Sequence, residues 1–337
     1  MIELRKKIDE YDYLYLSARI HALENKLLTR ERIERMLSAR TAEEAAKVLS
    51  ECGYGDFPAV LTPSAIEAAL DGARQAVFAD LRREAPDPAM VDVFCIKYDY
   101  HNMKVLIKGE ATGQDPAPLL LEAGRYPAGQ LREDYEKGAL DRYAPRFRQA
   151  AAEAREALAA SGDPQAADLV LDRACYAELL EAAQASGSAF LEGYVRLSID
   201  VADLRSAVRS ARTGRGAAFL QRVLLPGGAV DPEKLAAAVL SGAELAGLYA
   251  HGWLSAAAEA GDEARKGGPL TRFERLCDDA LTHYLSQARR AAFGEQPLIG
   301  YLYAKESELT AIRIILTGRL AGLDTETIRE RLRESYV

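Results

Sequence analysis

The sequence predicts an all-α protein built from three similar helical units. Two observations lead to this prediction: apolar residues recur at helical spacing through most of the chain, and one segment occurs three times at long intervals. Leu309, Ile312 and Leu316 follow the i, i+3, i+7 spacing of one helical face. The strict alternation of apolar and polar residues that is typical of half-buried strands is scarce.

The repeated segment is recognised by two aspartates at a constant separation. They are Asp71 and Asp99 in the first copy and Asp172 and Asp200 in the second, so the two copies are offset by 101 residues (200 − 99). The sequences around the second aspartate read YDYHNMKVLIKG and IDVADLRSAVRS, and each is followed by a turn rich in leucine, LLLEAGRY or VLLPGGAV. Units of this length are whole domains, longer than the repeats of stacked arrays.

A third copy begins at FERLCD, which ends at Asp278, and continues with YAKESELTAIRIILTG, in which Arg313 takes the place of Lys104 and Arg205. It runs out of chain, and its missing part resembles LLTRERIERML and EEAAKVLSECGY near the N-terminus. We therefore expect both ends of the chain to fold into one domain. The expected domains are residues 1–61 with 271–337, residues 62–162, and residues 163–270.

Length and composition fit this organisation. The 337 residues are 49% apolar and 28% charged, as is ordinary for globular proteins. The net charge of −8 argues against a nucleic-acid surface, which needs a basic stripe. The charged start MIELRKKIDEYDY predicts no signal peptide, and the uncharged run 245–258, expected as part of one buried alanine-rich helix over 236–258, is too short to span a bilayer.

Helix boundaries are marked by capping residues, glycines and prolines. The expected starts are Thr41 with Glu44, Thr271 with Glu274, Thr62-Pro63 and Asp231-Pro232, and the expected stops are Gly109, Gly113, Gly318 and Gly322. Linkers are expected at 85–88, 161–164 and 267–269. We interpret Gly124 and Gly227-Gly228 as turn residues with left-handed backbone.

Motifs for catalysis or metal binding are lacking. The histidines His21, His101, His251 and His283 and the cysteines Cys52, Cys95, Cys175 and Cys277 show no metal-ligand spacing, and the cysteines are expected to be buried thiols. There is no GxxxxGK[ST] phosphate loop and no GxSxG elbow. Asp278-Asp279 resembles the aspartate-rich helix of prenyl-transferring enzymes, but Thr282 stands where DDxxD needs its last aspartate. We predict no catalytic, cofactor-binding or metal-binding residues.

The repeated acids are better explained by structure than by chemistry. The repeated acids Asp71, Asp172 and Asp278, and the equivalent Asp99 and Asp200, are expected to pair between helices with repeated bases such as Lys104, Arg205 and Arg313. Such pairs add little to net stability and more to packing geometry. A catalytic site repeated three times would keep its polar residues, whereas Asn102 is replaced by Asp203 and then by Ala311.

Four segments together carry a family resemblance. They are YDYLYLSARIHALENKLLTRERIERML, YDYHNMKVLIKG, YVRLSIDVADLR and IGYLYAKESELTAIRIILTGRLAGLDTETIRERLRESYV. In this order and at this spacing they resemble the C-type subunit of prokaryotic V-type (A/V-type) ATPases and ATP synthases, which is the counterpart of the d-type subunit of eukaryotic V-ATPases. The resemblance covers essentially the whole chain.

The resemblance implies an all-α funnel of three similar domains around a pseudo-threefold axis. Family members form a central-stalk rotor component that sits on the cytoplasmic face of the membrane rotor ring and receives the end of the central shaft, made of D- and F-type subunits. The chain would then be a non-catalytic, peripheral component that transmits torque for proton or sodium transport, without a cofactor. The alternative interpretation is a helical adaptor or scaffold unrelated to ATPases.

Overall fold

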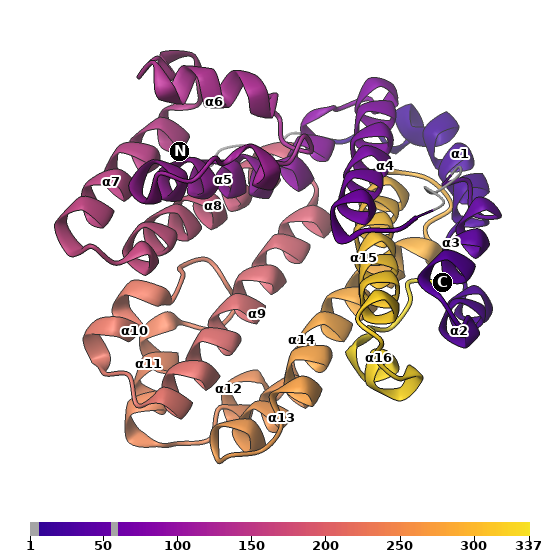
Figure 1. Ribbon diagram of the computed structural model, residues 1–337. Helices are drawn as coiled ribbons and strands as arrows, with labels where there is room; N and C mark the ends of the chain where they lie inside the picture. The colour runs from indigo at the N-terminus through magenta and orange to yellow at the C-terminus, as the bar shows by residue number, and fades with distance from the viewer. Residues whose placement is uncertain (1–6, 55–59) are drawn as a thin grey trace.

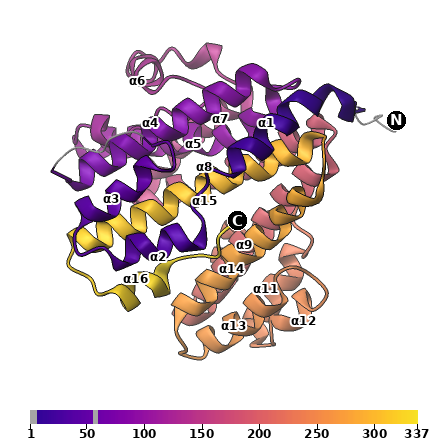
Figure 2. The same cartoon turned by 90° about the vertical axis from the view of Figure 1, so that its right-hand side faces the viewer.

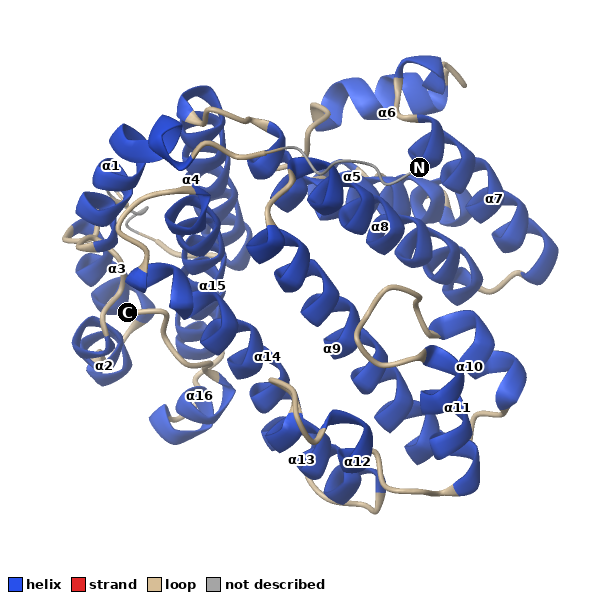
Figure 3. Ribbon diagram, turned by 180° about the vertical axis from the view of Figure 1, so that it is seen from behind, coloured by secondary structure: helices blue, strands red, loops and turns tan. Residues whose placement is uncertain are grey.

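The computed structural model describes residues 7–54 and 60–337, and all regular structure within these ranges is helical (Figures 1 and 3). Six helices, here called the frame helices, organise the fold: α4 (Pro63–Glu84), α5 (Ala89–Thr112), α8 (Pro164–Ser186), α9 (Ala189–Thr213), α14 (Leu270–Leu285) and α15 (Glu295–Leu320). The start of the chain, on which the signal-peptide prediction rests, and residues 55–59 of the expected terminal domain lie outside the described residues.

The other helices connect or cover the frame. They are α1 (Leu14–Glu24), α2 (Arg30–Ser38), α3 (Ala42–Ser50), α6 (Ala128–Glu136), α7 (Pro145–Ser161), α10 (Ala217–Val223), α11 (Pro232–Ser241), α12 (Ala246–Tyr249), α13 (Ser255–Arg265) and α16 (Thr325–Arg331). Short 3-10 turns are η1 (Glu10–Tyr13), η2 (Ala117–Leu119), η3 (Leu140–Arg142) and η4 (Ser286–Arg290). The all-α prediction is confirmed.

The frame helices pack as three antiparallel pairs: α5 with α8, α9 with α14, and α15 with α4. Each pair therefore joins the later frame helix of one sequence copy to the earlier frame helix of the next copy. The last pair joins the third copy back to the first, and Figure 1 shows α15 and α4 side by side. The repeat thus closes on itself through packing between the two ends of the chain.

An ion-pair ladder follows these three pairs. It contains Lys104–Asp172 at 2.6 Å, Arg205–Asp278 at 2.7 Å and Arg313–Glu67 at 2.6 Å, with a second rung of Lys108–Asp168 at 2.8 Å and Arg209–Glu274 at 2.7 Å. The predicted pairing of the repeated acids is confirmed for two of them. It is wrong for Asp71, which pairs with Arg74 at 2.9 Å, because Glu67, one helical turn earlier, takes the position opposite Arg313. It is also wrong for Asp99, which pairs with Arg125 at 2.6 Å, and for Asp200, which accepts from the backbone of Ala229.

Hydrophobic cores fill the space around each pair. One cluster spans residues 96–175, one spans 197–280, and one combines 28–70 with 309–328. A fourth cluster lies where the corners between frame helices meet and includes Leu81, Met90, Leu191, Leu298 and Tyr336. Each of the first three clusters contains residues from both sides of one expected domain boundary, at position 162, 270 or 61 respectively. The division of the chain into domains at these positions stays a prediction.

The two terminal segments pack together. Helices α1 and α3 contact α15, and α16 contacts α2, so that Figure 2 shows the N-terminal helices alongside the yellow α15. Leu37 and Leu49 from the N-terminal segment share a core with Ile312, Ile315 and Ile328 from the C-terminal segment. This packing agrees with the expectation that both ends of the chain belong to one domain, and that assignment stays a prediction.

Buried carboxylates hold the leucine-rich turn of each unit. Asp99 accepts hydrogen bonds from the backbone N–H groups of Arg125 and Tyr126, at 2.9 and 3.3 Å. Asp200 accepts from Ala229 and Val230 in the same way, at 3.0 and 3.1 Å. Glu308, at the equivalent position of the third copy, accepts from the N–H of Leu28 and from the hydroxyl of Tyr54.

Two glycines are explained by these carboxylates and not by a left-handed backbone. Only Gly227 of the three turn glycines has positive φ, +107°, so the interpretation is wrong for Gly124 and Gly228. A Cβ at Gly124 would lie 2.4 Å from Asp99 Oδ1, and one at Gly228 would lie 2.3 Å from Asp200 Oδ1. The repeated glycine therefore makes room for the repeated acid.

Most predicted helix boundaries are confirmed. Thr41, Thr62 and Asp231 cap helices, and Gly113 ends α5 with a left-handed backbone. The start at Thr271 is wrong, because α14 begins at Leu270 after Pro269. Gly322 follows the end of α15 with a left-handed backbone, as predicted. The stops at Gly109 and Gly318 are wrong, because both glycines lie inside helices, where their missing Cβ lets Pro116 and Ile328 approach. The expected helix over 236–258 is broken, since α11 ends at Ser241 with Gly242 as its cap, and α12 and α13 follow.

Asp203 offers a test of how these turns are held. It is 2% exposed, accepts from Leu225 N at 2.8 Å, and burial raises its pKa to about 7. The equivalent Asn102 already accepts from Leu121 N at 2.9 Å without carrying a charge. Because the folded pKa is raised, the contribution of Asp203 to stability is fully present below its unfolded pKa of about 3.9 and is lost as the pH rises through about 7.

We therefore predict that Asp203→Asn stabilises the protein at pH 8 by about 1–3 kcal/mol and flattens the fall in stability between about pH 4 and 7. The measurement is urea-induced unfolding at several pH values. The exposed cap variant Asp231→Asn is the control and should stay within about 0.5 kcal/mol of the parent, since Asn caps a helix as well as Asp does. An Asp203→Asn variant with the parent's pH profile would contradict the account.

Candidate functional site

The candidate site is a cavity where three frame helices from different copies face one another. It consists of two adjoining hollows of about 300 and 470 Å³, which share Lys97 of α5, Tyr194 of α9 and Leu281 of α14. The first hollow also extends along α15, past Tyr303 and Glu306. We call this space the central cavity.

The central polar contact is the ion pair between Lys97 and Glu306. The Lys97 side chain is 43% exposed, within the cavity, and Glu306 is 13% exposed. Burial disfavours the charged form of Lys97, but the Glu306 carboxylate outweighs burial and raises the lysine pKa above its ordinary value. Lys97 therefore stays charged, and its contact with Glu306 ties α5 to α15 across the cavity.

Further groups gather around Glu306. Tyr98 donates its hydroxyl to Glu306 Oε1 at 2.5 Å, and Arg74 Nε lies 3.5 Å from the same oxygen. Both Arg74 and Lys97 lie over the Tyr98 ring, about 5 Å from its centroid. One carboxylate thus joins α4, α5 and α15.

Aromatic side chains continue the wall beside this pair. Tyr194 stacks on Phe94 with ring centroids 5.5 Å apart and meets Tyr303 edge-on at 6.0 Å. Burial raises the pKa of Tyr303 to about 12, so its hydroxyl remains protonated. Aromatic groups with polar tips next to charged groups are typical of protein–protein contact surfaces.

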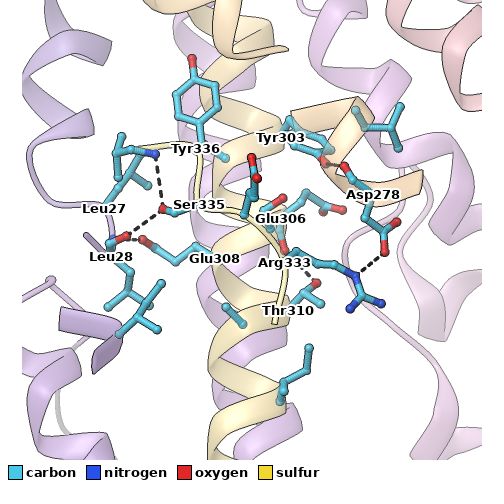
Figure 4. A pocket seen from close by; sticks show the side chains of 18 of the residues that line it. Leu27, Leu28, Asp278, Tyr303, Glu306, Glu308, Thr310, Arg333, Ser335 and Tyr336 are labelled. Atoms are coloured by element: carbon cyan, nitrogen blue, oxygen red, sulfur yellow. Dashed lines mark hydrogen bonds and ion pairs between the residues drawn. The ribbon is translucent and has the colours of Figure 1, made fainter. Parts of the chain in front are cut away.

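The last five residues of the chain, 333–337, form one side of the first hollow (Figure 4). Arg333 Nε lies 2.6 Å from Asp278 Oδ2, and the N–H of Glu334 donates to Asp279 Oδ1 at 2.9 Å. Tyr336 is buried against Gly300, where a Cβ would lie 2.4 Å from its hydroxyl. The extended tail is therefore a fixed part of the wall.

The residues singled out for possible chemistry do not assemble into a site. Among the described residues no group of three or more His, Cys, Asp or Glu side chains is placed to hold a metal ion. All four cysteines are free and buried, and burial raises the pKa of Cys95, Cys175 and Cys277 to about 12. The carboxylate of Asp278 pairs with Arg205 and Arg333, and that of Asp279 accepts a hydrogen bond from the backbone N–H of Glu334.

Sequence reasoning missed the residues of the central cavity. Lys97 and Glu306 occupy equivalent positions of two copies, next to the repeated acids Asp99 and Glu308. Their chemistry differs between the copies, so a search for repeated residues passes over them. The sequence carries one signal for them: Lys97 and Glu306 have opposite charges although the repeat places them at equivalent positions.

Comparison with known proteins identifies the family. The chain matches the family described as ATP synthase (C/AC39) subunit over residues 16–331 and belongs to it. It is 25% identical to the C-type subunit of a V-type sodium ATPase of Enterococcus hirae over 96% of this chain and 99% of the relative. It is 26% identical to the C-type subunit of an A-type ATP synthase of Methanocaldococcus jannaschii, over 96% and 87% of the two chains. The alternative of an adaptor unrelated to ATPases is thereby excluded.

No helix in the described part of the chain is long and apolar enough to cross a membrane. The family consists of ATP synthase subunits, so this chain is a component of a larger assembly.

The structure predicts that Glu306 stabilises the site by holding two cations. Glu306→Gln leaves Lys97 and Arg74 close together without their shared anion, and should lower the free energy of unfolding by about 1–3 kcal/mol. Adding Lys97→Met should restore part of this loss, because it removes the repulsion. The measurement is urea-induced unfolding followed by circular dichroism.

The matched control is Glu67→Gln, which removes a half-exposed acid from the ladder on α4. Exposed pairs contribute little, so this variant should lose less than about 1 kcal/mol. A Glu306→Gln variant that is no less stable than Glu67→Gln would show that the cluster around Glu306 is not a stabilising contact.

Proposed function

We propose that the chain is a non-catalytic central-stalk subunit that couples the central shaft of a V-type ATPase or ATP synthase to its membrane rotor ring. The observation that carries this proposal is the central cavity, a hollow lined by partly buried aromatic and charged groups of α5, α9 and α15. Family membership supports it. The D- and F-type shaft subunits are the proposed occupants, and the three helix pairs are proposed to form a funnel around a pseudo-threefold axis.

The mechanism that follows is mechanical. Torque applied to the cavity wall passes into the frame helices, whose close-packed interiors have low compressibility. The corner cluster joins the helices at one end, and the ladder fixes the register of each pair along its length. A ring bound to another face of the same body would then turn with the shaft.

The subunit would work on the cytoplasmic face of the cell membrane, held there through the ring. Its acidic surface suits protein partners and not nucleic acid. No chemical step is assigned to it, and ATP hydrolysis would take place elsewhere in the assembly. Calorimetry of the isolated chain with ATP and with Zn²⁺ should therefore show no tight, stoichiometric binding, and such binding would contradict the proposal.

Reconstitution tests the coupling directly. In vesicles that lack this subunit, the soluble head should still hydrolyse ATP, but ATP-driven ion uptake should fail because torque no longer reaches the ring. Hydrolysis should also lose its sensitivity to reagents that block the ring carboxylates. Adding back the purified chain should restore both properties, whereas undiminished uptake without the chain would show that it is not the coupler.

A further inference from the structure

The first hollow of the central cavity lies between two frame helices that meet at one corner. α14 ends at Leu285, α15 begins at Glu295, and residues 286–294 form the corner between them. Near the corner the hydroxyl of Tyr303 lies 3.1 Å from Thr282 Oγ1 and joins the two helices. Beyond this contact the hollow separates them, and residues 333–337, here called the tail strap, bound it on one side. Figure 2 shows the end of the chain between α14 and α15.

The equivalent corner between α8 and α9 is built differently. Only Gly187 and Ser188 separate these two helices, which pack directly on one another. The corner 286–294 is longer, and the hollow lies between α14 and α15 where α8 and α9 are in contact. Part of the connection between the α9/α14 pair and the α15/α4 pair therefore passes through the tail strap.

Polar groups fasten the strap to α14. Arg333 Nε lies 2.6 Å from Asp278 Oδ2, and the N–H of Glu334 donates to Asp279 Oδ1 at 2.9 Å. The Glu334 carboxylate also lies 2.5 Å from His283 Nε2. The ion pair of Arg333 is 27–29% exposed, and that of Glu334 is 55–56% exposed. Water and salt therefore reach this end of the strap.

Packing holds the other end of the strap. Tyr336 is 4% exposed and belongs to the corner cluster. Its hydroxyl fills a notch at Gly300 of α15, where a Cβ would lie 2.4 Å from the oxygen. Arg289 of the corner donates to the Tyr336 carbonyl at 3.3 Å, and the Ser335 hydroxyl donates to the Leu28 carbonyl, also at 3.3 Å. The glycine makes room for the ring inside a helix, where glycine is otherwise unfavourable.

We propose that the tail strap holds the α9/α14 pair at a fixed opening from the α15/α4 pair and can be released at its α14 end. Figure 4 shows the two fastenings, with Arg333 directed toward Asp278 and Tyr336 pointing away from it. Partly exposed ion pairs contribute little to stability and weaken in salt, whereas apolar burial of the Tyr336 ring is not screened. Release would therefore leave Tyr336 in place, free α14 from α15 and widen the first hollow. The strap would act in this way whatever occupies the cavity.

The distance between two spin labels measures the opening. The labels are attached to cysteines introduced by Thr271→Cys and Leu320→Cys, at exposed positions near the ends of α14 and α15 that lie far from the corner. The four native cysteines are buried, and the chain without the new cysteines gives the background. We expect one narrow distance distribution at low salt. In about 1 M KCl, where the Debye length is about 3 Å, the distribution should become longer and broader.

Charge reversal should release the strap without added salt. Arg333→Glu places an acid beside Asp278 and Asp279, and should lengthen the label distance at low salt as KCl does in the parent, with no further increase when salt is added. The matched control is Arg331→Glu, the same charge change at an exposed position at the end of α16, which should keep the parent's distance. Removal of residues 333–337 should lengthen the distance at least as much as Arg333→Glu does.

The outcomes test the two parts of the proposal separately. An unchanged distance after removal of residues 333–337, in a chain whose circular dichroism matches that of the parent, would overturn the strap. A distance that changes on removal, but neither with salt nor in Arg333→Glu, would overturn release at the α14 end. If the shortened chain does not fold, Arg333→Glu decides both parts, because this side chain lies outside the core, and an unchanged distance in that variant would overturn the proposal.

Discussion

The rest of the structure depends on the closure of the helix frame between α15 and α4. Two of the three antiparallel pairs join neighbouring parts of the chain, but this pair joins its two ends. Its core brings together residues from 28–70 and 309–328, and Arg313 pairs with Glu67 across it. Without this contact the repeat would be an open row, and Glu306 could not reach Lys97 and Arg74 at once.

Stability and geometry come from different groups in this frame. Apolar burial in the four clusters is the dominant favourable contribution, whereas half-exposed ion pairs contribute about 0–1 kcal/mol each. Lys104–Asp172 and Arg313–Glu67, with side chains 23–46% exposed, therefore fix helix register more than they stabilise the fold. The buried carboxylates Asp99, Asp200 and Glu308 have a different role. They accept hydrogen bonds from backbone N–H groups in the turns that cross the helix ends.

Much of the fold could be predicted because the repeat places like residues at like positions. The repeat predicted the ladder acids Asp172 and Asp278, and its split third copy predicted the contact between the chain ends. It failed at Asp71 and at Gly124, since neither the choice between acids one helical turn apart nor the close approach of a side chain is visible in a linear pattern. The central cavity could not be predicted, because Lys97 and Glu306 meet only after the frame closes and share no chemistry to search for.

The central claim is that one chain holds shaft and ring at the same time. The direct measurement is the mass of complexes formed when the purified chain is mixed with D- and F-type shaft subunits and the detergent-solubilised ring. The account predicts a single assembly that contains shaft, chain and ring, and no shaft–ring complex when the chain is left out. A chain that binds only one of the two, or a shaft that binds the ring equally well without it, would contradict the account.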